Sequence, residues 1–513
     1  MRLAKAEAPP GAAAGAWSRR LAAALLVAAL ALLLLKLPAT VAFSRAILAY
    51  PFQVDDSEGV ILSEAQWLAR GVDPYQPARP DLFTAAPYTP IFTALNAAAF
   101  AVAPFTFKVG RGLALLATLA VAALAALLVR RRTGSALLAL WAGLAILTLN
   151  LVTVWSVRAR PDELALACNL AGLAVVWWRW PAEDAGGAGR PRRDEWRALA
   201  LAAGLCALGF YTKQTLLAAP LAAGLYLLLR RPRLGVAFGA LYAALVAVPF
   251  VALDLATRHG FYQHIVAFHS SWAAADYLRL ARPFVARYWP LLAAAALLPL
   301  AVVAGGARLR RDPDLLPALY LPLAALGSLG AGTHGGNHNH FVETLVAAAL
   351  CAALLAGRLA ARGATGRVAA AALVLLLSVA SVAEARLAPA DWLARDYRAP
   401  LPAEREGWAQ LAAFVTNDPG PVYSDNVGLL LVAGKPVDYT DPFTLAYAAE
   451  TGQWDQRALV GRIERGEFHL IALRYDVFAV SGAPTDLTPE MLAAIRAHYR
   501  LIQRNVVFVY APR

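Results

Sequence analysis

Long apolar runs recur along this chain of 513 residues, and they limit what it can fold into. An α-helix needs about 20 mostly apolar residues to cross the hydrocarbon core of a bilayer. Eleven runs at or near that length lie at about 21–43, 112–129, 136–154, 163–180, 198–212, 215–229, 235–256, 288–304, 315–331, 341–357 and 368–386. Backbone polar groups in lipid must be hydrogen-bonded within the protein, so the runs predict a mainly α-helical, polytopic membrane protein.

Arginine-rich connectors between the runs predict the orientation of the bundle. Arg19 and Arg20 precede the first run, and positive residues that flank spans tend to stay in the cytoplasm. The connectors that share this side are Arg130–Arg132, Arg190–Arg197, Arg230–Arg233, Arg308–Arg311 and Arg358–Arg367. We therefore predict a cytoplasmic tail at 1–20, a transmembrane domain at 21–387 with its first outer loop at 44–88, and a place in the plasma or inner membrane.

The net charge of +13 would suggest a nucleic-acid partner in a soluble chain. Here 59% of the residues are hydrophobic, and most arginines lie in the short connectors, where they act as topology signals. We therefore expect the lipid bilayer as a partner and no nucleic acid.

Residues 88–107 are apolar and nearly long enough to span. A crossing here would place Arg130–Arg132 outside and invert every later loop, and prolines break both ends of the segment. We predict that it is re-entrant or lies along the outer interface, which leaves eleven spans and an outer C-terminus. The alternative is a full span, with a twelfth crossing elsewhere in the chain.

From about residue 388 the composition becomes mixed polar and apolar. The periodicity predicts helices at 404–416, 456–465 and 489–499, and strands at 421–424, 468–474 and 501–510. Alternating elements of this kind predict a small α/β domain at 388–513, on the extracytoplasmic side if the span count holds.

An acidic cluster lies in the first outer loop, where Asp55, Asp56 and Glu58 precede an amphipathic stretch at 58–70. Charged groups beside a bilayer are costly and are usually kept for function. A carboxylate here can act as a general base or hold an acceptor hydroxyl. The alternative is a solvated cluster that caps the helix, because Asp, Ser and Glu are common helix starters.

Several cations are predicted on the outer side, against the usual bias of membrane proteins. Arg111, Arg158, Arg160 and Lys213 suit a lipid-linked phosphate, because guanidinium binds phosphate oxygens through two parallel hydrogen bonds. The alternatives are extension of these side chains to lipid headgroups or pairing with nearby acids.

A glycine-rich segment at 330–343 carries three histidines and two asparagines. We expect Asn337, Asn339 and His340 to bind sugar or phosphate, with a plain polar loop as the alternative. Histidines 334, 338 and 340 have the chemistry of metal ligands, but no second spaced ligand pair accompanies them, so no metal or other cofactor is indicated.

The order of these features resembles that of the GT-C superfamily of multi-span glycosyltransferases, close to glycosyltransferase family 39 and the RgtA/B/C/D-like groups. The resemblance covers roughly residues 20–360. The features that carry it are Asp55–Gly59, Leu68, Gly71, Pro74–Tyr75, Tyr88–Pro90, Gly110–Arg111, Trp155, Arg160, Asp162, Lys213–Gln214 and the loop with Asn337 and Asn339.

The resemblance implies transfer of a sugar from a polyprenyl-phosphate donor to a glycan, lipid or protein acceptor on the outer face. It also implies that an Asp of the first outer loop is the base. The usual family pattern is Asp followed directly by Glu. Here Ser57 intervenes, so Asp55 and Asp56 are both candidates, and the helical spacing of Asp55 and Glu58 favours Asp55. Substrate contacts are expected from Tyr88, Asp162 and Gln214.

Two other functions fit part of the sequence. A transporter or flippase for a lipid-linked or anionic substrate would use the same outer cations, but should show charges at mid-membrane depth and internal repeats. The sequence shows few such charges and no repeat. A non-catalytic envelope assembly subunit would bind a partner through its C-terminal domain, whose Asp425, Asp438, Asp441 and Asp455 can contact an acceptor or cap helices.

Overall fold

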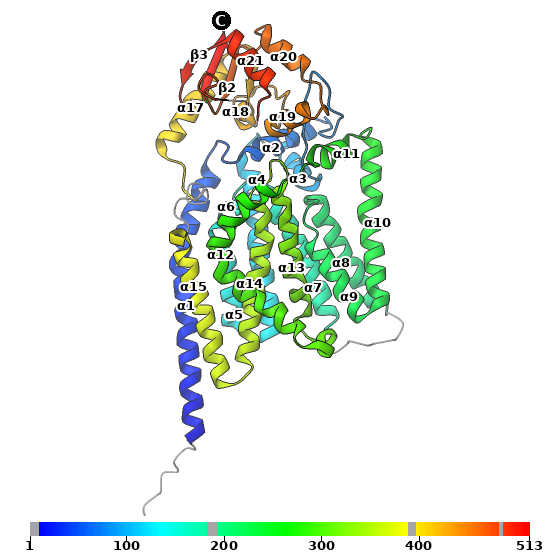
Figure 1. Ribbon diagram of the computed structural model, residues 1–513, viewed down its shortest axis with the longest axis vertical. Coiled ribbons are helices and arrows are strands. Elements are labelled where there is room, and N and C mark those ends of the chain that lie inside the picture. Colours follow the sequence, from blue (N-terminus) through cyan, green and yellow to red (C-terminus); the bar gives the residue numbers. More distant parts are fainter. Residues whose placement is uncertain (1–9, 182–191, 388–396, 482–485) are drawn as a thin grey trace, which may run out of the picture.

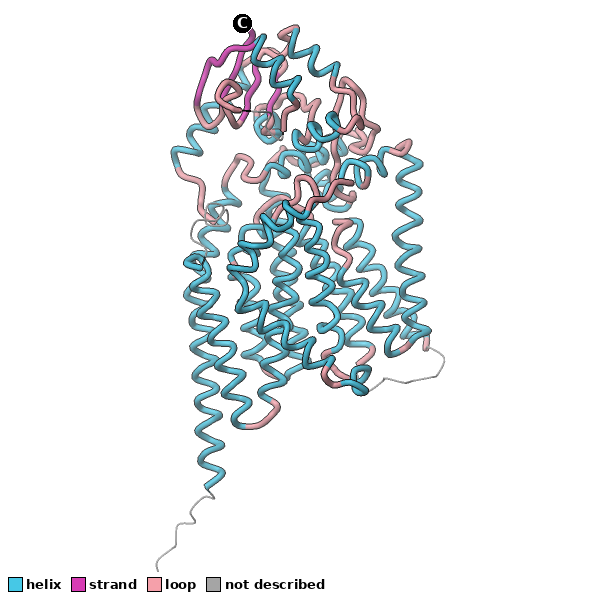
Figure 2. Tube along the Cα trace, in the orientation of Figure 1, coloured by secondary structure: helices cyan, strands magenta, loops and turns pink. Residues whose placement is uncertain are grey.

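The computed structural model consists of a helix bundle with a small α/β domain at one end (Figures 1 and 2). It describes residues 10–181, 192–387, 397–481 and 486–513. The predicted domain start at 388 and Arg190, the first arginine of the connector at 190–197, lie outside these ranges, whereas Arg192, Arg193 and Arg197 lie within them.

All eleven predicted runs form helices. Their bounds are α1 Pro10–Ala49, α4 Phe107–Thr133, α5 Ala136–Thr148 with α6 Asn150–Ser156, α7 Asp162–Arg179, α8 Arg193–Thr212, α9 Ala218–Arg230, α10 Pro232–Ala256, α12 Ala274–Val303, α13 Leu315–Gly327, α14 Val342–Ala360 and α15 Ala364–Leu387. Among the described residues, seven helices are long and apolar enough to span, and α5 with α6, bent by 66°, makes an eighth if the pair is one span. The shorter or more polar α7, α8 and α9 stay predicted spans.

The ambiguous segment 88–107 contains α3, a helix of ten residues at Ile91–Phe100. Such a helix is about 15 Å long, half of what a crossing needs. It packs beside α2 (Asp56–Ala69) at the end of the bundle that carries the C-terminal domain (Figure 1). This agrees with a re-entrant or interfacial helix and contradicts the alternative of a full span.

Three arginine-rich connectors meet at the opposite end of the bundle. Arg132 of the α4–α5 connector bonds Asp314 at 2.7 Å, and Arg358 at the end of α14 bonds Asp312 at 2.9 Å. Arg230 at the end of α9 donates to the carbonyl of Asp312. The connectors therefore share one side, as the sequence predicts, and the cytoplasmic identity of that side stays a prediction.

A buried polar network inside the bundle pairs two of the few charges that lie within the predicted spans. Lys36 of α1 bonds Glu384 of α15 at 2.9 Å. Both carboxylate oxygens of Glu384 accept from the backbone N–H of Asn150, each at 3.2 Å, and Tyr288 of α12 donates to the same group. Asn150 begins α6 after the bend, so the network caps N–H groups that the broken span leaves unpaired.

Replacing Glu384 with Gln should lower the free energy of unfolding by about 1–3 kcal/mol, because Lys36 then keeps no carboxylate partner. Thermal unfolding in detergent measures the loss. Lys36→Met with Glu384→Gln should cost less than the sum of the two single changes. Unchanged stability of the Glu384→Gln variant would contradict the capping role.

The C-terminal domain holds a four-stranded sheet of order β1-β2-β4-β3, with β1 parallel to β2 and the other pairs antiparallel. The bounds of its elements are α17 Pro402–Asn417, β1 Val422–Ser424, α18 Val427–Val432, α19 Pro442–Glu450, α20 Arg457–Glu464, β2 Leu470–Leu473, α21 Pro489–His498, β3 Tyr499–Arg504 and β4 Phe508–Pro512. One prediction is wrong: 501–510 is a hairpin, because the chain turns where the N–H of Asn505 bonds the carbonyl of Val507. Helices α18 and α19 had no counterpart in the predicted elements.

The first outer loop attaches the C-terminal domain to the bundle. The N–H of Phe83 donates to the carbonyl of Asp438, and the N–H of Thr440 donates to the carbonyl of Phe83, both at 3.0 Å. Helix α2 packs against α18 with Gly59 facing Gly428, where a Cβ on Gly59 would lie 2.5 Å from the amide nitrogen of Gly428. The residues of α2 from 58 to 65 are therefore all buried, whereas the sequence predicted an amphipathic stretch at 58–70.

Candidate active site

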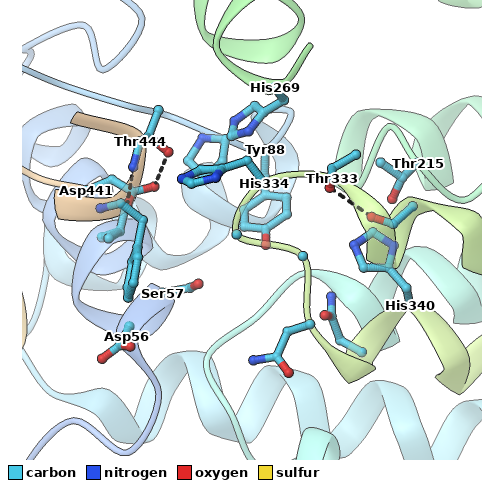
Figure 3. A pocket seen from close by; sticks show the side chains of 18 of the residues that line it. Asp56, Ser57, Tyr88, Thr215, His269, Thr333, His334, His340, Asp441 and Thr444 are labelled. Carbon is cyan, nitrogen blue, oxygen red and sulfur yellow. Dashed lines mark hydrogen bonds between the residues drawn. The ribbon is translucent and has the colours of Figure 1, made fainter. Parts of the chain in front are cut away.

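A cavity of about 680 Å³ lies between the bundle and the C-terminal domain. Its walls come from the first outer loop, the turns after α8 and α11 (Gly260–Ile265), the segment between α13 and α14, and the start of α19. Figure 3 shows Asp56 and Asp441 on one wall and Thr215 with His340 on the opposite wall. Segments far apart in the chain thus converge on one polar space.

Asp55 is held between two arginines at the edge of this cavity. Its Oδ2 bonds Arg158 at 2.8 Å and its Oδ1 bonds Arg160 at 2.9 Å, while the carboxylate also caps α2 through the N–H of Ser57. Burial alone would raise the pKa of Asp55, but Arg160 and Arg158 outweigh it and lower the pKa below its usual value. Asp55 is therefore an ionised group that orients two cations.

Asp56 is more open, with 42% of its side chain exposed. Its Oδ2 bonds Arg474 of the C-terminal domain at 2.6 Å. The desolvation that comes with its partly buried position raises the pKa of Asp56 above its usual value, and the nearby charge of Asp55 adds to this, although Arg474 opposes both. An accessible carboxylate with a raised pKa is better suited to accept a proton than one clamped by two arginines.

Glu58 and Arg111 form a buried, bidentate ion pair outside the cavity. Their side chains are fully buried, with Nε–Oε1 and Nη2–Oε2 distances of 2.8 and 2.7 Å. Arg111 also donates to the carbonyls of Ile47 and Tyr50, and Glu58 accepts from the N–H of Ala159 at 2.9 Å. The pair joins the end of α1 to the segment that carries Arg158 and Arg160, so we assign it to the framework and not to the chemistry.

The floor of the cavity holds a second charged group. Lys213 forms an ion pair with Asp162, whose Oδ1 also accepts from Asn339 at 2.6 Å. Arg160 approaches the other oxygen of Asp162 at 3.4 Å. Lys213, Arg160 and Asn339 line the cavity, whereas Asp162 lies beneath it and holds them in place.

Tyr88 completes this arrangement. Its hydroxyl contacts Arg160, and its ring faces Arg160 and Lys213 at 5.5 and 5.8 Å from the ring centre. Gln214 also lines the cavity, with its amide bonded to the carbonyl of Pro87 at 2.8 Å. Arg158 lies behind Asp55 and does not reach this space, and it lines a separate cavity instead.

Asn337, Asn339 and His340, the predicted substrate contacts of the histidine-rich segment, line the cavity. His334 lines it as well and stacks on Tyr447 at 4.9 Å between ring centres. Across the described ranges, no group of three or more His, Cys, Asp or Glu side chains is arranged to hold a metal ion.

Sequence reasoning missed His269, which lines the cavity, and did not single out Arg474, which does not line it but bonds Asp56. Of the acidic residues noted in the C-terminal domain, Asp441 lines the cavity and caps α19, and Asp438 pairs with Arg462. Asp425 binds Arg474. A local motif does not predict these placements, because each depends on how the domain docks.

Comparison with known proteins supports the fold. No protein-family model and no curated protein sequence matches the chain. Among solved structures, ArnT from Cupriavidus metallidurans matches in its apo state with a TM-score of 0.60 and bound to undecaprenyl phosphate with 0.61, at 13% identity over 93% of this chain and 97% of that one. The apo oligosaccharyltransferase of Archaeoglobus fulgidus matches with a TM-score of 0.50, at 13% identity over 86% of this chain and 69% of that one.

These matches define the class of fold. The chain shares the fold of these proteins, a helix bundle with a small C-terminal α/β domain, and the bundle agrees with the fold that the sequence resemblance implied. At 13% identity the likeness establishes the fold, and the activity has to be argued from the site.

Proposed function

We propose that this protein is an integral-membrane glycosyltransferase that moves a sugar from a polyprenyl-phosphate donor to an acceptor hydroxyl on the outer face of the membrane. The observation that carries the proposal is the cavity that the carboxylate of Asp56 lines together with the cations Arg160 and Lys213. A base for the acceptor and cations for a departing phosphate are what this displacement needs. The similar fold of ArnT, in a structure bound to undecaprenyl phosphate, supports a lipid phosphate as the leaving group.

In the proposed reaction, the acceptor oxygen forms a bond to the anomeric carbon while the bond from that carbon to the phosphate oxygen breaks. The proton of the acceptor hydroxyl passes to Asp56. The lipid phosphate leaves with the bonding electron pair, and Arg160 and Lys213 stabilise its charge. Asp55 keeps Arg160 directed at this space. Assigning the base to Asp56 departs from the preference for Asp55 based on helical spacing, because the partner in that spacing, Glu58, is bound to Arg111.

A transporter or flippase is less well supported. Within the bundle, Lys36 is paired with Glu384, and Glu384 caps the start of α6, where the span is broken. A non-catalytic assembly subunit would not need a base and phosphate-binding cations in one cavity. Transfer at the outer face, a cytoplasmic N-terminus and the plasma or inner membrane remain parts of the proposal.

The test is transfer of radiolabelled sugar from a panel of polyprenyl-phosphate donors by the purified full chain in nanodiscs, together with binding of undecaprenyl phosphate to the same sample. Labelled product from any donor supports the proposal. If no donor reacts and undecaprenyl phosphate does not bind above its level in empty nanodiscs, the proposal is wrong.

Lys213→Met should weaken the binding of undecaprenyl phosphate by about 10- to 100-fold, the usual effect of losing a hydrogen bond to a charged group. Microscale thermophoresis in nanodiscs measures the change. Lys108→Met is the matched control, because Lys108 is exposed at the start of α4 and does not line the cavity. Equal affinities for the two variants would remove Lys213 from the phosphate site.

A further inference from the structure

We propose that Arg474 of the C-terminal domain, which bonds the cavity-lining Asp56, is a positioning residue for Asp56 in the transfer reaction. The inference rests on the proposed function and deepens it, because it makes the C-terminal domain part of the active site. Asp56 and Arg474 are 418 residues apart in the chain and belong to different domains.

The guanidinium of Arg474 is fixed on three sides. Its Nε bonds Asp425 at 3.2 Å, and its Nη2 bonds Asp486 at 3.1 Å. The backbone N–H of Arg474 also donates to Asp425, and the guanidinium lies over the ring of Phe443. Asp425 and Asp486 are buried in the C-terminal domain and hold the guanidinium of Arg474 in a fixed orientation toward Asp56. Its Nη1 bonds Asp56 across the domain boundary at 2.6 Å.

This contact selects one oxygen of Asp56. Arg474 binds Oδ2, and within the described part of the chain no hydrogen bond to Oδ1 is formed. Oδ1 is therefore available for an acceptor hydroxyl in the cavity. The other charged groups that act on Asp56 are the carboxylates of Asp55 and Asp441, and both disfavour its ionised form. Arg474 opposes them, so it orients the base and favours its ionised form.

Arg474 does not carry the docking of the two domains alone. Phe83 pairs with Asp438 and Thr440, Gln53 accepts from the N–H of Gly428 at 2.8 Å, and Trp454 donates to the carbonyl of Arg79 at 2.7 Å. A variant that lacks the guanidinium should therefore keep the domains together. Effects on the base can then be separated from effects on the fold.

The experiment compares Arg474→Gln and Arg474→Lys with Arg462→Gln in nanodiscs. Arg462 supports the docking segment through Asp438 but is not among the groups that act on Asp56, so Arg462→Gln is the matched control. We expect Arg474→Gln to lower kcat at least tenfold with little change in the donor KM. We also expect it to move the acidic limb of the pH profile of kcat/KM upward by about one unit, since Asp56 loses its cation. Arg474→Lys should restore part of kcat and part of the shift in the pH profile, and Arg462→Gln should change neither kcat nor the pH profile.

A second readout does not depend on turnover. Carbodiimide labels protonated carboxyl groups, and mass spectrometry of the digested full chain reports Asp56 separately from Asp425 and Asp486. The pH midpoint of Asp56 labelling should rise in Arg474→Gln and stay in place in Arg462→Gln. If the pH midpoint of Asp56 labelling is the same in Arg474→Gln as in the wild type, the inference is overturned whether or not a donor is found. A raised midpoint without transfer from any donor would leave the Arg474–Asp56 contact established and count against the proposed function.

Discussion

Asp56→Asn is expected to lower kcat by about 10²- to 10⁴-fold, the usual contribution of a positioned general base. The change removes the proton acceptor but preserves the shape of the side chain. Its oxygen can still accept from Arg474, so the docking of the C-terminal domain should be kept. Undecaprenyl phosphate should bind with nearly the wild-type affinity, because Arg160 and Lys213 are untouched. Initial rates of sugar transfer at saturating donor, together with the binding constant, measure the two effects separately.

Asp55→Asn is the comparison that assigns the base. It weakens two buried ion pairs, so we expect a loss of thermal stability and a displaced Arg160, seen as weaker binding of the donor. The assignment to Asp56 is wrong if Asp56→Asn retains full activity while Asp55→Asn folds, binds lipid phosphate and is inactive. In that case Asp55 would be the base, and Arg158 and Arg160 would set its pKa.

The bundle was predictable because its signal is local. Each span is a continuous apolar run. Helix α2 is indicated by a capping acid followed by apolar residues at helical spacing. The arginine connectors were predicted from composition alone to share one side, and the contacts of Arg132 and Arg358 with Asp314 place their two connectors together at one end of the bundle. The break between α5 and α6 was not predicted, because the acceptor that makes it tolerable, Glu384, lies 234 residues away.

The site was predictable in its residue types and only partly in its geometry. Asp55, Arg160 and Lys213 do gather at one cavity. Sequence cannot distinguish a carboxylate that faces the cavity from one that is paired below it, since Asp56 and Glu58 are two residues apart on the same helix. The role of Arg474 depends on a docking surface assembled from loops of both domains, so no local pattern predicts it.

Breaking the pair of Glu58 and Arg111 is expected to be the most destabilising single change in the outer loop. Glu58→Gln leaves a fully buried guanidinium without a carboxylate, and removing one partner of such a pair costs about 3–5 kcal/mol. Arg111→Met should cost a similar amount, because it also leaves the carbonyls of Ile47 and Tyr50 without their donor. Thermal unfolding in detergent, followed by tryptophan fluorescence, reports both losses.

If Glu58 and Arg111 serve the framework, loss of their ion pair should leave substrate binding and the pH dependence of transfer unchanged. At temperatures where the Glu58→Gln variant remains folded, its donor affinity and the pH limb of its kcat/KM should match those of the wild type, because Glu58 does not face the cavity. The costs of Glu58→Gln and Arg111→Met should also be far from additive in the double variant, since either change alone already breaks the pair. A Glu58→Gln variant with unchanged unfolding temperature and no transfer would reverse the assignment. It would return Glu58 to the catalytic group that the acidic loop suggested.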